Sequence, residues 1–273
     1  MQARRLPAAR GAHWLLEGLR VFRNNPPLIT SLTITWLLLA QLLAQTMGAP
    51  GQLLLWLLTP TAYLIIANGC RLADAKTAPS WRGLRHGVSN NSGPLFRLGG
   101  LLVFGYALVL LADTLLGGGV SILLLPPAET ATAPATSALI GDDGVPQGGA
   151  EELLAFAVLR LLLLSAPLFL IFLFTAYMVG WDRVAPLKSL FFSAVAVWRN
   201  LPALFIFGLV ALLFAFLAPA IVLTTIGQIF GMTPTAVFFA MRLLLVFFVA
   251  PVLFAGQYAC YRDIFHPGVD DNA

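Results

Sequence analysis

Six long apolar runs divide the chain, and each is continuous rather than alternating between apolar and polar positions. Each run has about 20 residues, the length of helix that crosses the hydrocarbon core of a bilayer. Only helices and closed barrels satisfy backbone polar groups in lipid, and barrel strands alternate, so the runs predict an all-α polytopic bundle of six transmembrane helices. The predicted spans are residues 28–47, 52–70, 95–116, 153–179, 203–226 and 236–260.

The composition supports a membrane protein. Hydrophobic residues make up 59% of the 273 residues and charged residues only 10%, whereas a soluble domain has about 25% charged residues. The N-terminus is basic before its first apolar run, as in a signal peptide, but that run begins near residue 28 and is long enough to span. We therefore expect a retained first helix and not a cleaved signal.

Lysine and arginine lie almost entirely on one side of the predicted spans, and the three connections on the other side contain none. Because basic residues near span ends stay on the cytoplasmic side, both termini are predicted to be cytoplasmic. Residues 1–27 are then a cytoplasmic tail with an interfacial helix, 28–265 the membrane domain and 266–273 a second cytoplasmic tail. The 14 basic residues on this side are Arg4, Arg5, Arg10, Arg20, Arg23, Arg71, Lys76, Arg82, Arg85, Arg97, Arg183, Lys188, Arg199 and Arg262.

This placement also explains the net charge of +4. The basic residues cluster beside the spans, so the expected partners are membrane lipids, with anionic lipid at the cytoplasmic face, and no nucleic acid. The largest outer connection, residues 117–150, is rich in Gly, Pro, Ala, Thr and Asp and is predicted to be flexible. A lid over a ligand is the alternative for this loop.

Residues 10–24 predict an amphipathic helix before the first span. At 100° per residue one side is apolar and the other charged or polar, with Leu16 as the misfit. Such a helix usually lies in the membrane interface; the alternative is a docking helix for a cytoplasmic partner. The apolar side comprises Trp14, Leu15, Gly18, Leu19, Val21 and Phe22, and the polar side Arg10, His13, Glu17, Arg20, Arg23 and Asn24.

An internal repeat is visible at the starts of the odd-numbered spans. Residues 22–26 read Phe-Arg-Asn-Asn-Pro and residues 198–202 read Trp-Arg-Asn-Leu-Pro, with a weaker echo in Asn-Asn-Ser-Gly-Pro at 90–94. A proline in the first helical turn sacrifices no hydrogen bond. We expect three parallel helical-hairpin repeats, each led by an interfacial segment and related by an axis along the membrane normal.

Motifs with known catalytic mechanics are absent: there is no nucleophile elbow, phosphate loop or zinc-binding His-Glu-x-x-His helix. His13, His86 and His266 are too widely spaced to predict a metal site. Cys70 and Cys260 end two predicted spans and are expected to be reduced packing residues. No cofactor, metal or catalytic residue is predicted, and the protein is not expected to be an enzyme.

Three ionisable residues interrupt the spans: Asp113, Arg160 and Arg242. Counting about 1.5 Å per residue from the outer ends, they lie about 5 to 10 Å deep in the outer half of the membrane. Charges at that depth must pair, snorkel to the headgroups or face a wet cavity. The three are therefore the candidate intramembrane polar cluster, either a structural brace or a small pocket for an anion or a lipid headgroup.

The end of the sixth span, residues 258–265, reads Tyr-Ala-Cys-Tyr-Arg-Asp-Ile-Phe. Aromatic residues with a nearby arginine usually anchor a helix end at the membrane interface. A protein contact is the alternative for this segment.

The chain resembles a known family at both ends. The residues that carry the resemblance are Gly11-x-x-Trp14, then Gly18-Leu19-x-x-Phe22-Arg23-x-Asn25-Pro26, and Tyr261-Arg262-Asp263-Ile264-Phe265. This combination is similar to a proteobacterial family of uncharacterised six-span inner-membrane proteins, the BPSS-type family. The resemblance implies a bacterial inner (plasma) membrane location, and it transfers no activity or catalytic residue.

Two hypotheses for function follow. The first is a non-enzymatic accessory or assembly factor of the inner membrane, acting on a membrane-protein partner through its basic cytoplasmic face. The second is a transporter or lipid-handling protein for an anionic small molecule or lipid headgroup, using Asp113, Arg160 and Arg242. A lipid-modifying enzyme ranks third.

Overall fold

A computed structural model describes residues 3–116 and 150–266, and every regular element in this part of the chain is helical. The predicted all-α class is therefore confirmed for these residues, whereas nearly all of the predicted flexible loop at 117–150 and of the tail at 266–273 lies outside them. The elements are α1 (Arg10–Asn24), α2 (Pro26–Asp74), α3 (Trp81–Leu84), α4 (Ser92–Leu115), α6 (Ala150–Phe172), α7 (Thr175–Gly180), α8 (Pro186–Arg199), α9 (Leu201–Leu212), η1 (Leu213–Leu217), α10 (Ala218–Ile229), α11 (Pro234–Leu244), η2 (Leu245–Val249) and α12 (Ala250–Phe265).

Five helical stretches among the described residues are long and apolar enough to cross a membrane, which makes the chain a multi-pass membrane protein. They are Pro26–Asp74, Ser92–Leu115, Phe156–Gly180, Leu201–Ile229 and Pro234–Phe265. The sequence predicts six spans, and the difference lies in α2, which contains two of them.

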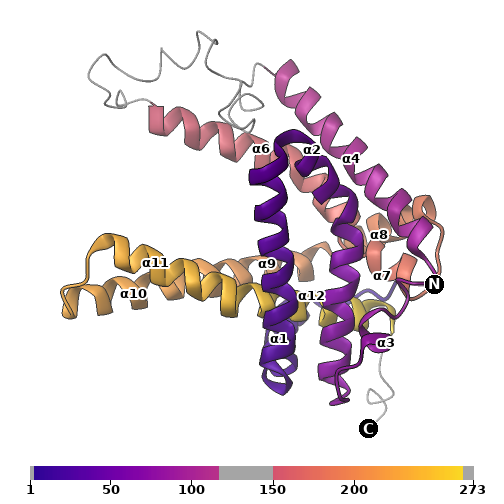
Figure 1. Cartoon of the computed structure of the whole chain (residues 1–273), viewed down its shortest axis with the longest axis horizontal. Coiled ribbons are helices and arrows are strands. Elements are labelled where there is room, and N and C mark those ends of the chain that lie inside the picture. The colour runs from indigo at the N-terminus through magenta and orange to yellow at the C-terminus, as the bar shows by residue number, and fades with distance from the viewer. Residues whose placement is uncertain (1–2, 117–149, 267–273) are drawn as a thin grey trace.

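Helix α2 turns back on itself at Gly48, where φ is 58° and ψ is −130°, a conformation that only glycine adopts readily. The two arms on either side of this residue lie side by side (Figure 1). Just before the first arm begins, the side chain of Asn24, the last residue of α1, donates a hydrogen bond to the Ala73 carbonyl oxygen near the end of the second arm, at 3.2 Å. Near the turn, a Cβ atom on Gly51 would collide with the Leu43 carbonyl oxygen, so the hairpin needs glycine there to close.

Two further antiparallel pairs follow along the chain. Helices α4 and α6 pack together, with the rings of Tyr106 and Phe169 5.9 Å apart. The stretch from α9 to α10 pairs with the stretch from α11 to α12, and the rings of Phe214 and Phe248 meet 5.8 Å apart. These two phenylalanines lie in η1 and η2, single π-helical turns at the same level of the pair. One residue separates each π-helical turn from a proline, which has no amide hydrogen to donate.

The three pairs diverge from a shared base and do not form one parallel bundle. Figure 1 shows α10 and α11 extending to the left, away from α2, while α4 runs toward the top of the view. Only 6–28% of the most apolar window of each long helix is buried inside the protein. Lipid solvates such surfaces as well as another helix would, so no apolar driving force packs the hairpins of the predicted six-helix bundle together away from the base.

The base is built around α1, whose apolar side packs against α12 and α9. A Cβ atom on Gly18 would lie 2.5 Å from the Gly256 backbone nitrogen, so the two backbones are in direct contact. Trp14 and Val21 are fully buried, and Leu16 points outward. The predicted helix is therefore confirmed, and its apolar side is covered by α9 and α12 of the same chain. Its location in the membrane interface stays a prediction.

Asparagine occupies the N-cap position at the junctions at which the sequence suggests a repeat. The Asn91 and Asn200 side-chain amides each donate to the carbonyl oxygen four residues earlier, at 3.0 and 2.9 Å. Asn25 instead accepts from the Leu28 backbone amide at 3.3 Å. The second and third junctions thus share a geometry that the first lacks, and the threefold repeat stays a prediction.

Candidate functional site

Asp113 and Arg160, two of the three predicted intramembrane residues, form an ion pair between α4 and α6. Arg160 Nε donates to Asp113 Oδ1 at 2.9 Å. The aspartate side chain is fully buried and the arginine side chain is 32% exposed. The second carboxylate oxygen, Oδ2, has no hydrogen-bond partner among the described residues. This arrangement neutralises Arg160 and joins two helices.

Arg242, the third residue of the predicted cluster, does not join them. It is exposed on α11, which packs on α10 and η2 in the pair that extends away from α4 (Figure 1). The structure therefore brings two of the three predicted residues together and leaves Arg242 on a separate pair of helices, because the hairpins diverge in the half of the molecule where these residues lie.

A dense ionic network lies instead at the base, the end of the molecule where α1, the last turns of α2 and α12 and the turn at 180–183 meet. Arg262 bridges two helices, since it bonds to Asp74 on α2 and lies 3.2 Å from Glu17 on α1. Asp263 accepts from Arg10 Nε at 2.7 Å and from Trp14 Nε1 at 2.8 Å. These bonds hold α1, α2 and α12 together.

The fourth acidic residue of the base, Asp182, accepts a hydrogen bond from the Tyr261 hydroxyl and lies 3.3 Å from His266 Nε2. It therefore ties the turn at 180–183 to the end of α12. Three of the acidic side chains described at this end pair with arginine, namely Glu17, Asp74 and Asp263. The partner of Asp182 is His266, which is charged only when protonated.

Aromatic rings pack beneath the ionic network. Tyr261 is 1% exposed and contacts Tyr177, Trp181 and Phe265 at ring-centroid distances of 4.9, 5.5 and 5.0 Å. Tyr258 is also buried. The aromatic end of the sixth span, which the sequence suggests as a headgroup anchor, is therefore largely a protein core.

The described residues contain neither a disulfide nor a metal-binding group. Cys70 and Cys260 are buried, free thiols, as expected, and no group of histidine, cysteine and carboxylate side chains in this part of the chain is arranged to bind a metal ion.

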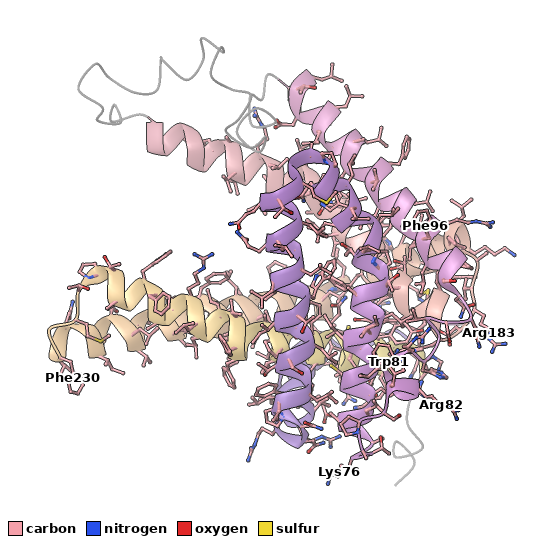
Figure 2. The ribbon with its side chains drawn as sticks, viewed as in Figure 1. Lys76, Trp81, Arg82, Phe96, Arg183 and Phe230 are labelled. Atoms are coloured by element: carbon pink, nitrogen blue, oxygen red, sulfur yellow. The ribbon has the colours of Figure 1, made fainter. Side chains whose placement is uncertain are left out.

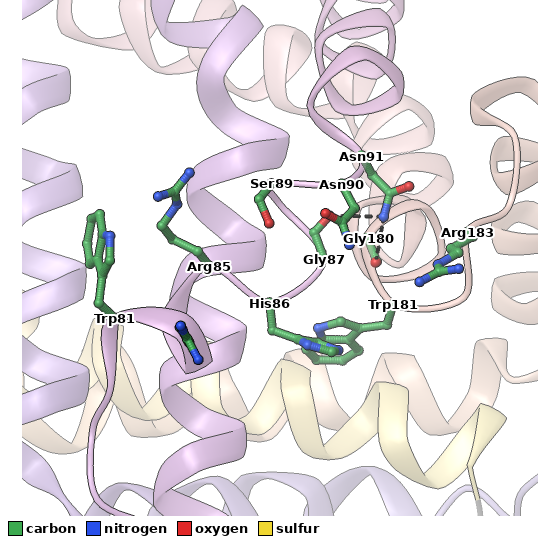
Figure 3. A pocket seen from close by; sticks show the side chains of 11 residues that line it. Trp81, Arg85, His86, Gly87, Ser89, Asn90, Asn91, Gly180, Trp181 and Arg183 are labelled. Carbon is green, nitrogen blue, oxygen red and sulfur yellow. Dashed lines mark hydrogen bonds between the residues drawn. The ribbon is translucent and has the colours of Figure 1, made fainter.

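A basic pocket of about 290 Å³ opens at the base between α3, the turn at 85–91 and the turn at 180–183 (Figure 3). None of the described residues that line it is acidic. The charged and aromatic side chains around it are Trp81, Arg82, Arg85, His86, Trp181 and Arg183. In the sequence, each of these arginines indicates only the side of the membrane on which it lies. About 90 positions separate the two turns, so the sequence does not predict the pocket.

Glycine and asparagine hold the two turns together. The Asn91 amide donates to the carbonyl oxygens of Gly87 and Gly180 at 3.0 and 3.1 Å. Gly87 has a φ of 76°, and a Cβ atom there would collide with the Gly180 carbonyl oxygen. The wall of the pocket therefore requires glycine at position 87.

A buried asparagine on α2, Asn68, supports the pocket from behind. Its amide donates to the Leu84 and His86 carbonyl oxygens at 2.9 and 2.8 Å, and its Oδ1 accepts from Trp181 Nε1 at 2.9 Å. One side chain thus fixes both turns against the rigid core, and a pocket on a fixed frame can bind without reorganising.

The positive charge around the pocket affects the protonation of His86. Its pKa is lowered from the ordinary value by partial burial and by the positive charges of Arg71 and Arg183. The imidazole is therefore neutral at pH 7, and the fixed positive charge of the pocket comes from its arginines.

Comparison with known proteins places the chain beside a bacterial membrane protein. It is 29% identical over 271 residues to a probable inner membrane protein of Burkholderia thailandensis, and the match covers 97% of this chain and 94% of that protein. No protein-family model and no solved structure matches the chain. The match does not test the narrower BPSS-type resemblance. Together with the long apolar helices, it identifies the chain as a multi-pass integral membrane protein.

Proposed function

We propose that this is a six-span protein of the bacterial inner membrane, with both termini in the cytoplasm, that acts as a non-enzymatic accessory or assembly factor for other membrane proteins. Its working surface is the base, which the one-sided distribution of lysine and arginine assigns to the cytoplasm. The sixth span comes from counting the two arms of α2 separately, since Gly48 reverses the chain between them.

The observation that carries this proposal is the uneven pairing of charge at the base. All four acidic side chains described there are used in contacts within the chain. Lys76, Arg82, Arg85 and Arg183 have no acidic partner in the described part of the chain and are exposed. A rigid frame with a permanent surplus of positive charge steers and binds anionic partners.

Topology is tested first, with reporter fusions at Ala49, Ala133 and Gly231. The proposal expects periplasmic reporter activity at all three positions. Cytoplasmic activity at any one of them would refute the six-span orientation.

The accessory role is tested in a strain that lacks the protein. The amounts of other inner-membrane proteins and their complexes are measured by quantitative proteomics, with and without a complementing copy. Complementation should fail with the charge-reversal variant Arg82→Glu/Arg85→Glu/Arg183→Glu and succeed with Asp113→Asn. An unchanged membrane proteome in the deletion strain would sink the accessory role.

The same experiment addresses the alternative, a transporter or lipid-handling protein that uses the outer-half residues. That function would be lost with Asp113→Asn and retained with the charge reversals at the base. The alternative is the weaker candidate, because Asp113 offsets the charge of Arg160 and Arg242 lies on a separate arm.

A further inference from the structure

Two basic residues at the base adopt a backbone conformation that normally belongs to glycine. Lys76 has a φ of 51° and Arg183 a φ of 55°. Lys76 follows the end of α2, where the Thr77 amide bonds back five positions to the Leu72 carbonyl oxygen at 3.0 Å. This is the Schellman motif, whose left-handed position usually holds glycine. After Arg183 the Val184 amide bonds back six positions, to the Met178 carbonyl oxygen at 3.1 Å, so the left-handed residue there closes a wider turn.

A left-handed conformation is unfavourable for a residue with a side chain. The fold does not use the Arg183 side chain to compensate, since no hydrogen bond or ion pair joins it to another described residue. It points to the pocket rim (Figure 3). Strain of this type is typical of functional sites.

The pocket also has unused hydrogen-bond donors. The side chains of Ser89 and Asn90 line it and make no hydrogen bond to another residue in the described ranges. Asp182, the acidic residue nearest in sequence to Arg183, is engaged by Tyr261 and His266. Guanidinium groups together with hydroxyl and amide donors, without a competing carboxylate, match the needs of a phosphate group.

The surroundings of the pocket favour a lipid as the source of that phosphate. Trp81 at its edge is 71% exposed, and Phe96 on the first turn of α4 is 58% exposed. Figure 2 shows Trp81, Arg82, Phe96 and Arg183 on the same side of the molecule. Helix α4 continues from Phe96 as an apolar span, so a phosphate in the pocket would have an apolar surface beside it for acyl chains, with tryptophan at headgroup level.

We propose that the pocket between α3 and the turns at 85–91 and 180–183 binds the phosphate of an anionic phospholipid headgroup. Arg85 and Arg183 bind the phosphate oxygens, Asn90 and Ser89 complete the donor set, and Asn91 is a positioning residue that keeps the two turns together. The assignment to the cytoplasmic leaflet rests on the proposed orientation, whereas the binding itself does not.

The test uses the full-length protein in detergent, with lipids added singly and counted by native mass spectrometry. The probes are phosphatidylglycerol, phosphatidic acid, zwitterionic phosphatidylcholine and inorganic phosphate. The variants are Arg85→Gln and Arg183→Gln, and the matched control is Arg23→Gln, an exposed arginine of the same end that lies outside the pocket.

The expected result is a tight site for one anionic lipid whose affinity falls at least about tenfold in each pocket variant, the factor for one lost hydrogen bond to a charged group. It should not change in Arg23→Gln, and phosphatidylcholine should not occupy the site. Asn91→Ala should weaken binding less than the arginine variants and broaden the distribution of bound lipid.

Three outcomes would overturn the proposal. Equal losses in Arg23→Gln would mean that the attraction is a property of the whole basic surface. Unchanged affinity in the pocket variants, with thermal unfolding confirming that they fold, would place the lipid elsewhere. Displacement of the lipid by inorganic phosphate at equal concentration would assign the pocket to a soluble anion. The accessory role is measured separately in the deletion strain, so either idea can fail alone.

Discussion

Replacing Arg183 by glycine should stabilise the fold and weaken lipid binding in the same molecule. The residue has a φ of 55°, which costs a side-chain-bearing residue roughly 1–2 kcal/mol. Glycine removes this strain but gives back roughly 0.5–1 kcal/mol through its greater freedom in the unfolded chain. The free energy of unfolding should therefore rise by roughly 0.5–1 kcal/mol, which for a chain of this size raises Tm by about 1–4 °C.

Thermal unfolding in detergent, with and without phosphatidylglycerol, measures both effects. At a lipid concentration 100 times Kd, a bound lipid stabilises the wild type by about 2.7 kcal/mol, and a tenfold weaker site gains only about 1.4 kcal/mol. Arg183→Gly should start from a higher Tm without lipid and gain less when lipid is added.

Arg183→Gln is the matched control, since it keeps the left-handed strain and removes only the charge. It should have the wild-type Tm without lipid and the same reduced gain with lipid. If either variant lost several degrees of Tm without lipid, the Arg183 side chain would be structural and the reasoning would be refuted.

Three further predictions concern other parts of the molecule. Arg160→Leu leaves the buried Asp113 carboxylate without its counter-charge and should lower the free energy of unfolding by about 3 kcal/mol; the double variant with Asp113→Leu should recover most of this loss, and a failure to recover would mean that the two residues are not coupled. Gly18→Val should separate α1 from α12 and lower Tm in the same assay, because a Cβ atom there lies 2.5 Å from the Gly256 nitrogen, whereas Gly208→Ala, with nothing within 4 Å, should not. Arg183→Gln should raise the pKa of His86 toward its ordinary value in a histidine NMR titration, since one cause of its lowered pKa is removed. Because the folded pKa is below the unfolded one, His86 lowers the stability of the fold as pH falls through about 6.5, and an increase of stability in that range would contradict the assignment.

Local residue patterns were enough to predict that this protein lies in lipid and where its membrane helices begin and end. Continuous apolar runs can only be helices in lipid, and the predicted segments agree with α2, α4 and the later helices to within a few residues. The amphipathic pattern of residues 10–24 correctly identified the buried side of α1, including Trp14, and the exposed misfit Leu16. These properties are local, because each depends on neighbours within two or three helical turns.

Which segments contact one another became visible in the packing of the helices and not in the residue pattern. Apolar residues that face lipid and those that face another helix look alike in a sequence, since lipid is as apolar as leucine. Hydropathy therefore did not reveal that α1 is covered by α12, that Arg242 lies apart from Asp113, or that the hairpins diverge.

The pocket depended on tertiary structure for the same reason. Arg85 and Arg183 line one pocket because Asn91 donates to backbone oxygens of both turns, while Asn68 donates to a backbone oxygen of the first turn and accepts from the Trp181 indole of the second. Such contacts leave no periodic signal, and each arginine alone reports only the side of the membrane on which it lies. The sequence thus set the charge of the base, and the packing of two distant turns made a binding site from it.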